Sequence, residues 1–223
     1  MLLSATSASW RSANPFLVKA PVQRKLLTLY GIALAVVLVD QAVKYWMVAE
    51  LTTRFDGLAT VGARLEALYG TPPAEAFDGL HFRAKRSVTL SPDFLRIRYA
   101  ENTGAAFGLF RGMPSAMRGL LFHLVSIGAV VLITVYYLRL STSAPSERFA
   151  RLGLSLVLGG ALGNYVDRLA RGFVIDFVEA HWHDRATWPS FNAADSCIVV
   201  GVGLLLLDGL TRRERKAEVS PGG

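Results

Sequence analysis

The sequence predicts an all-α membrane protein with four transmembrane helices and a small extracytoplasmic subdomain that contains a β-sheet and a helix. Of its 223 residues, 52% are hydrophobic and only 18% are charged, whereas soluble domains carry about 25% charged residues. The apolar residues gather in four blocks, as expected for membrane spans of about 17–25 residues each. This composition excludes a disordered chain, and a single cysteine excludes a disulfide-stabilised scaffold.

The four apolar blocks are the candidate spans. They run over about 26–47, 120–138, 152–166 and 193–210. The third block is short and rich in glycine, so it crosses the membrane only if it extends over about 149–169; otherwise it is a buried or re-entrant segment. We predict that it spans, because an even number of spans agrees with the distribution of charge. The chain then divides into a cytoplasmic tail (1–25), a four-helix domain (26–211) with an extracytoplasmic loop (50–113), and a second cytoplasmic tail (212–223).

Lysine and arginine residues near the span ends predict that both termini are cytoplasmic. Short segments rich in these residues stay on the cytoplasmic side of a membrane. They precede the first span, connect the second to the third, and follow the fourth: Arg11, Lys19, Arg24, Lys25, Arg139, Arg148, Arg151, Arg212, Arg213, Arg215 and Lys216. The segment 50–118 is also basic, but it is long and mixed with acids, and long segments are translocated largely regardless of charge. The net charge of +7 favours contact with membrane lipid. We expect no nucleic-acid partner, because the basic residues flank the spans.

The outer loop 50–113 is the only sizeable extramembrane part. Its first half carries apolar residues at helical spacing, which predict a short helix: Val61, Leu65, Leu68 and Tyr69. Its second half predicts two strands, at 88–90 and 94–99, of which the second alternates with period two. We expect a short helix and a small sheet on the outer face of the membrane.

Two groups of polar residues are candidates for a functional site. Asp40 and Lys44 are four residues apart in the first span, so they share a helix face and can pair. Ionisable residues within membrane helices are costly, and this pair is either a structural ion pair or part of a catalytic site. Asn102 and Gly104 belong to a run of small residues that allows a backbone to approach a ligand closely; an ordinary turn is the alternative.

A third group surrounds two aspartates. Small residues at 159–163 permit close helix packing, and three polar residues follow at the membrane edge: Asn164, Asp167 and Arg168. Asp176 is bracketed by apolar residues, and Asp195 lies at the start of the fourth span. Two carboxylates in a partly dry site tend to share a proton, which suits acid and base catalysis on a water molecule. For either aspartate alone, a helix cap or a salt bridge is the alternative.

Five motifs in order along the chain resemble the lipoprotein signal peptidase (signal peptidase II) family. They are Asp40-Gln41 with Lys44, Asn102-Thr103-Gly104-Ala105-Ala106-Phe107, Gly163-Asn164 with Asp167-Arg168, Val174-Ile175-Asp176-Phe177, and Phe191-Asn192-Ala193-Ala194-Asp195. The resemblance covers about 26–210 and implies an aspartic endopeptidase whose catalytic dyad is Asp176 and Asp195. It further implies a set of residues that line or brace the site: Asp40, Lys44, Asn102, Gly104, Asn164, Asp167, Arg168 and Asn192.

The same resemblance implies a substrate. This would be a bacterial prolipoprotein with diacylglyceryl on its lipobox cysteine, and cleavage would fall just before that cysteine. The resemblance implies no metal, no organic cofactor and inhibition by globomycin-type peptides, and we expect a monomer in the bacterial inner membrane. A transporter and a catalytically inactive binding protein are the rival classes. No inverted repeat supports the first, and the intact aspartate pair opposes the second.

One region departs from the family pattern. The outer segment 52–90 is longer than is usual between the first span and the Asn102 motif. It is either a cap over the substrate groove, a contact for a partner, or an inert insertion. One hypothesis is that its short helix closes over a bound lipopeptide and acts on substrate capture and product release.

Overall fold

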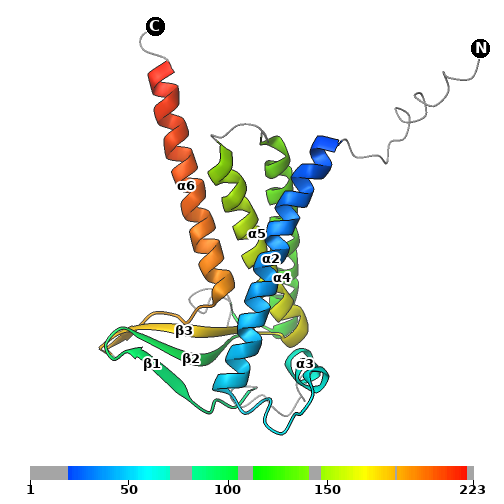
Figure 1. Ribbon diagram of the computed structural model, residues 1–223, viewed down its shortest axis with the longest axis vertical. Helices are drawn as coiled ribbons and strands as arrows, with labels where there is room; N and C mark the ends of the chain where they lie inside the picture. The colour runs from blue at the N-terminus through cyan, green and yellow to red at the C-terminus, as the bar shows by residue number, and fades with distance from the viewer. Residues whose placement is uncertain (1–19, 71–81, 105–112, 141–146, 184, 220–223) are drawn as a thin grey trace, which may run out of the picture.

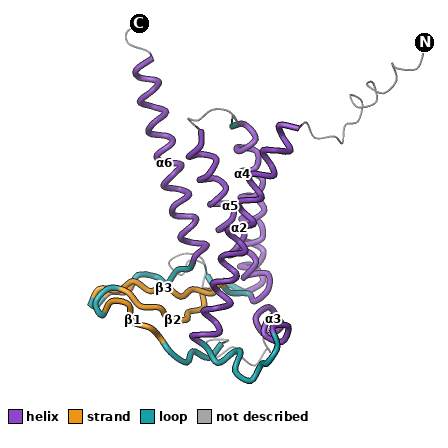
Figure 2. Tube along the Cα trace, in the orientation of Figure 1, coloured by secondary structure: helices purple, strands orange, loops and turns teal. Residues whose placement is uncertain are grey.

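The computed structural model describes residues 20–70, 82–104, 113–140, 147–183 and 185–219. Long helices stand side by side, and a small sheet projects sideways at one end of them (Figure 1, Figure 2). The long helices are α2 (Ala20–Leu51), α4 (Ser115–Arg139), α5 (Arg148–Arg171) and α6 (Ala193–Val219). Within the described residues, four stretches are long and apolar enough to cross a membrane: Pro21–Leu51, Met117–Arg139, Arg148–Arg171 and Ala193–Thr211. The predicted four spans are confirmed, but the fold is mostly helical with a sheet, and not purely all-α.

The third span is a complete helix at the centre of the bundle. Helix α5 packs against α6, α2 and α4. A Cβ atom at Gly160 would lie 2.4 Å from the Ala194 carbonyl oxygen of α6, and one at Gly159 would lie 2.6 Å from Val36 Cβ of α2. The glycines that make this segment a weak apolar block therefore allow α5 to approach two neighbours closely.

Two helices extend beyond the predicted boundaries. Helix α2 begins at Ala20, several residues before the predicted start of the span, with Pro21 in its first turn. Proline is tolerated there because the first turn of a helix needs no N–H donors. Helix α6 continues to Val219, past the end of its span at Thr211. Most of the predicted N-terminal tail lies outside the described residues.

The sheet is antiparallel, with strand order β1-β2-β3-β4. Its strands are β1 (Ser87–Ser91), β2 (Leu95–Asn102), β3 (Val174–Trp182) and β4 (Ala186–Thr187). The strands predicted at 88–90 and 94–99 are confirmed, and so is the short helix, which is α3 (Val61–Tyr69). Strand β3 was not predicted, although it carries Asp176.

A hydrophobic core joins the sheet to the outer end of α2. Its members come from α2, α3, β2, β3 and the segments between them: Val48, Leu51, Phe55, Leu68, Phe82, Tyr99, Phe173, Ile175 and Phe177. Phe82 stacks on Tyr99 and meets Phe173 edge to face. Burial of such aromatic side chains contributes most of the packing free energy of a small subdomain. The core therefore fixes the orientation of β3 relative to the helices.

Candidate active site

Asp176 and Asp195 come from different elements and meet through one asparagine. Asp176 lies near the start of β3 and is 2% exposed, and Asp195 lies in the first turn of α6. Between them, Asn192 donates from Nδ2 to Asp176 Oδ1 at 2.7 Å and from its backbone N–H to Asp195 Oδ2 at 3.2 Å. In return, Asn192 Oδ1 accepts from the Asp195 backbone N–H at 2.9 Å. This reciprocal pair is a capping box, so the helix cap and the aspartate pair are one structure.

Asparagine side chains hold the two remaining carboxylate oxygens. Asn102 Nδ2 donates to Asp176 Oδ2 at 3.2 Å, and Asn164 Nδ2 donates to Asp195 Oδ1 at 2.8 Å. Each of the four carboxylate oxygens thus accepts an N–H from an asparagine. Amide donors orient a carboxylate without adding a positive charge that would keep it ionised. This arrangement suits carboxyl groups that must gain and lose a proton.

A β-bulge brings Asn102 to the face of the sheet that carries Asp176. Ile97 pairs with Val178, but the next pairs are Ala100 with Asp176 and Asn102 with Val174, so β2 contains one extra residue. Side chains alternate between the two faces of a strand, and one extra residue reverses that alternation. Without the bulge, Asn102 would point to the opposite face.

The pKa of Asp176 is raised from 3.8 to about 7. Burial is the largest cause, because it disfavours the charged form, and the negative charge of Asp195 acts in the same direction. Hydrogen bonds from Asn102 and Asn192 lower the pKa but do not offset burial. Asp176 therefore exchanges a proton near neutral pH, as a general acid or base must.

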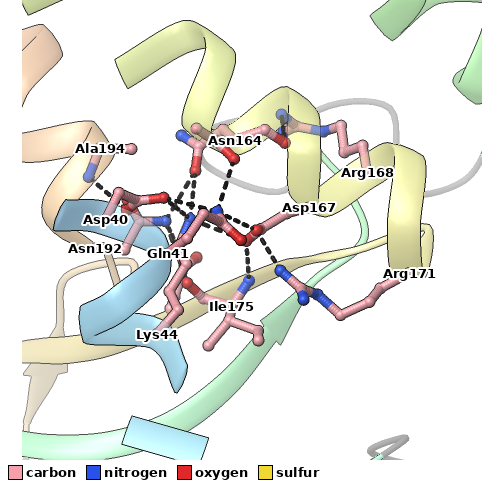
Figure 3. A network of polar contacts seen from close by, with 12 residues as sticks. Asp40, Gln41, Lys44, Asn164, Asp167, Arg168, Arg171, Ile175, Asn192 and Ala194 are labelled. Atoms are coloured by element: carbon pink, nitrogen blue, oxygen red, sulfur yellow. Dashed lines mark hydrogen bonds and ion pairs between the residues drawn. The ribbon is translucent and has the colours of Figure 1, made fainter. Parts of the chain in front are cut away.

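Behind the dyad lies a set of charged side chains that we call the buried ion cluster: Asp40, Lys44, Asp167 and Arg171 (Figure 3). Lys44 is fully buried, with Nζ 2.8 Å from Asp40 Oδ2 and 2.9 Å from Asp167 Oδ2. Arg171 pairs with the other oxygen of Asp167. Asp40 and Lys44 thus form the expected ion pair, but Lys44 has a second carboxylate partner on α5. The two carboxylates and the two basic side chains of the cluster balance in charge, as buried charges must.

The buried ion cluster also holds the backbone beside each dyad aspartate. Asp40 Oδ1 accepts from the N–H of Ala194 at 3.0 Å, and Asp167 Oδ2 accepts from the N–H of Ile175 at 3.1 Å. Ala194 immediately precedes Asp195, and Ile175 immediately precedes Asp176. The two carboxylates therefore fix the first turn of α6 and the start of β3 relative to each other.

Arg168 braces the turn that follows Asn102. Its Nη2 donates to the Gly104 carbonyl oxygen at 3.1 Å, and its guanidinium lies 4.1 Å from the centre of the Phe122 ring. Asn102 Oδ1 accepts from the Gly104 N–H at 3.1 Å, which closes the turn. The rest of this motif, Ala105-Ala106-Phe107, lies outside the described residues.

Two members of the site were missed in the sequence. Arg171 lies four residues after Asp167 on α5, the same spacing that revealed the first pair, so this signal was present. Gln41 is part of the first of the five motifs, but no role was predicted for it. Its Nε2 is 3.1 Å from Oδ2 of the adjacent Asp40 and 2.8 Å from Asp167 Oδ1. The second contact joins α2 to α5, and spacing alone does not reveal it.

The apolar stripe of α3 is divided between core and surface. Leu68 is fully buried, whereas Val61 and Leu65 are 65% and 42% exposed. The carbonyl oxygens of the last turn accept from side chains outside the helix: Leu68 from Arg171 at 3.2 Å and Ala67 from Arg54 at 2.9 Å. Basic groups at a helix C-terminus are also favourable for the helix dipole. The hypothesis that α3 closes over a lipopeptide stays a prediction.

The sequence is similar to a family and to curated relatives. A family profile described as signal peptidase (SPase) II matches residues 32–211. The lipoprotein signal peptidase of Anaeromyxobacter sp. (strain Fw109-5) is 46% identical over 175 residues, which cover 77% of this chain and 79% of that protein. The lipoprotein signal peptidase of Pseudomonas aeruginosa (strain UCBPP-PA14) is 37% identical over 149 residues, which cover 67% and 85%.

Two solved structures have a similar fold. Both are described as a bacterial membrane enzyme structure obtained by the in meso method, and both are 26% identical to this chain. The first has a TM-score of 0.58 and covers 87% of this chain and 94% of its own. The second has a TM-score of 0.52 and covers 81% and 90%.

Proposed function

Because this chain belongs to the signal peptidase II family of aspartic proteases, we propose that it cleaves diacylglyceryl-modified prolipoproteins immediately before the lipidated cysteine. Removal of signal peptides from prolipoproteins is the activity of this bacterial inner-membrane family. The position of the dyad supports cleavage immediately before the lipidated cysteine. Asp195 lies in the first turn of a span and Asp176 in a strand next to its end, where a peptide bond just outside the lipid can reach them.

Both termini face the cytoplasm, and the dyad faces the extracytoplasmic side. Two observations support this orientation. Basic segments lie at one end of the spans, as cytoplasmic segments do. The dyad lies at the other end of the bundle, near the C-terminus of α5 and the N-terminus of α6. A lipid-modified substrate stays in the bilayer through its acyl chains, so it reaches the site laterally. The enzyme works as a monomer without metal or organic cofactor, and globomycin-type peptides inhibit it by occupying the substrate site.

The single observation that carries the mechanism is the raised pKa of Asp176 beside a second carboxylate. Asp176 is the protonated member at rest; it donates a hydrogen bond to the scissile carbonyl oxygen and transfers its proton there as the tetrahedral oxyanion forms. Asp195 accepts a proton from the attacking water, whose oxygen forms the new bond to the carbonyl carbon. As the C–N bond breaks, Asp195 returns that proton to the leaving amine. The proton that Asp176 gave to the oxyanion then comes back to Asp176, so both groups end as they began.

Cleavage of a synthetic peptide with a diacylglyceryl-cysteine tests this function. The purified full-length protein should cut the lipidated peptide before the cysteine and leave the unlipidated peptide intact. Asp176→Asn and Asp195→Asn should each lower kcat by roughly 10³-fold or more, because an amide neither accepts nor returns the proton. Retained far-ultraviolet circular dichroism would show that both variants stay folded. Full activity in either variant would remove that aspartate from the mechanism.

A further inference from the structure

We propose that Tyr69, on helix α3 of the outer segment, is a positioning residue for the dyad and that it acts through Gln41. The Tyr69 hydroxyl orients the Gln41 amide, and that amide bridges the two carboxylates that hold the backbone beside the dyad aspartates. The proposal rests on the function proposed above for the dyad. It assigns helix α3 a role in catalysis, so that this part of the outer segment is not inert.

The orientation of the Gln41 amide is fixed by what surrounds it. Its Nε2 lies 2.8 Å from Asp167 Oδ1, 3.1 Å from Asp40 Oδ2 and 3.2 Å from the Gly163 carbonyl oxygen. Its Oε1 accepts from the Tyr69 hydroxyl at 3.0 Å. A flipped amide would point its oxygen at two carboxylates and a carbonyl, which repel it. Figure 3 shows Gln41 between the two aspartates.

Gln41 and Lys44 bridge the same two carboxylates in different ways. The Lys44 ammonium supplies charge from the end of a flexible stem, and it lacks the planar geometry of an amide. The Gln41 amide is planar and has two donors in fixed directions, so it constrains the relative orientation of the Asp40 and Asp167 carboxylates. These carboxylates bind the N–H groups of Ala194 and Ile175. Their orientation therefore determines where the neighbouring dyad aspartates lie.

Helix α3 is held firmly enough to orient the amide. The Arg171 guanidinium lies 5.1 Å from the centre of the Tyr69 ring and donates to the Leu68 carbonyl oxygen. Leu68 is fully buried in the core beneath the sheet. Burial also raises the pKa of Tyr69 above its ordinary value of 10.0, so its hydroxyl stays protonated and remains a donor. Helix α3 is thus firmly anchored, and its Tyr69 hydroxyl is always protonated. Through the Gln41 amide, this hydroxyl connects α3 to the dyad.

The test is Tyr69→Phe in the full-length protein, with the diacylglyceryl-cysteine peptide as substrate. This change removes one hydroxyl and keeps the ring against Arg171. We expect kcat to fall roughly 3- to 10-fold, as for one hydrogen bond, while KM stays within about twofold. The alkaline limb of the pH–kcat profile should move to lower pH. A looser dyad admits water and weakens the coupling between carboxylates, and both effects lower the pKa of the protonated member.

Tyr30→Phe is the matched control. It also removes a hydroxyl that joins two elements, since Tyr30 hydrogen-bonds Thr134 Oγ1 at 2.7 Å between α2 and α4, but it lies away from the site. We expect its kcat and pH profile to match those of the wild type. A Tyr69→Phe variant that behaves like Tyr30→Phe would overturn the inference, because a merely structural hydroxyl does not move the pH profile.

A double-mutant cycle tests the route through Gln41. If Tyr69 acts through Gln41, the double variant Tyr69→Phe/Gln41→Leu should be no slower than Gln41→Leu alone. Additive losses would overturn that route. If Gln41→Leu does not fold, the pH profile of Tyr69→Phe still decides the question. Wild-type cleavage that does not depend on Asp176 would instead overturn the proposed function and, with it, this inference.

Discussion

Replacing Asp176 with asparagine should abolish cleavage and also change how the stability of the protein depends on pH. The folded protein raises the pKa of this carboxyl from 3.8 to about 7. A raised carboxyl pKa stabilises the fold fully below about pH 4, and this contribution is lost as the pH rises to about 7. This difference between the two pKa values corresponds to roughly 4 kcal/mol of unfolding free energy. The asparagine variant should not lose this stability as the pH rises, because the asparagine side chain does not ionise.

An opposing cost does not depend on pH. Both oxygens of Asp176 accept from amide donors, Asn192 Nδ2 and Asn102 Nδ2. The new amide points its own NH₂ group at one of these donors, and an unsatisfied buried group costs about 1–3 kcal/mol. The variant should therefore be less stable than the wild type at pH 4 and more stable at pH 8. The difference between the two unfolding free energies should change by roughly 4 kcal/mol over that range.

Thermal unfolding from pH 4 to pH 8, followed by tryptophan fluorescence in one detergent, measures this change. For a chain of this size, 1 kcal/mol moves Tm by about 2–4 °C, so Tm of the variant should rise relative to the wild type by roughly 8–16 °C. Asp56→Asn is the control, because the Asp56 side chain is 59% exposed, and its Tm should run parallel to the wild type. A Tm difference between Asp176→Asn and the wild type that stays constant with pH would refute the reasoning.

Two further predictions concern packing and charge. Lys44→Met should lower stability by about 3–5 kcal/mol, because it leaves two buried carboxylates without their shared cation. Asp40→Asn should cost less, since Lys44 keeps Asp167 at 2.9 Å; equal losses in denaturant or thermal unfolding would contradict this ranking. Gly160→Ala should cost about 1–3 kcal/mol and slow cleavage, because its Cβ would lie 2.4 Å from a carbonyl oxygen in α6. Gly203→Ala is the control, because its Cβ would have nothing within 4 Å, and it should match the wild type in both assays. A stable, active Gly160→Ala variant would show that α5 and α6 can separate at no cost.

Elements that depend on local rules were predictable from the sequence. A membrane span satisfies its backbone hydrogen bonds internally and needs only apolar side chains of sufficient length, so all four spans were found. The same is true of α3, β1 and β2, whose apolar residues repeat at 3.6 or 2 residues. Asp40 and Lys44 were paired correctly because four residues is one helical turn.

Strand β3 and its register were not predictable from the sequence. Its buried end reads Val174-Ile175-Asp176-Phe177, an apolar run that does not alternate and fits either a helix or a buried strand. Its partner β2 lies about 80 residues earlier, as the pairing of Arg96 with Glu179 shows. The bulge that places Asn102 beside Asp176 arises only when the two strands are paired.

The sequence by itself therefore determined the membrane class, the spans, the short helix, two of the strands and, through five motifs, the residues expected at the site. Only the tertiary structure decided how those residues are connected. It gave Lys44 a second carboxylate, made Asn192 the link between the dyad aspartates, and brought Tyr69 of the outer helix to Gln41 of the first span. The physical reason is range. Helical and strand periodicity act between neighbours in the chain, whereas the hydrogen bonds from Asn192 to Asp176 and from Ala194 to Asp40 join residues 16 and 154 positions apart, which only packing brings together.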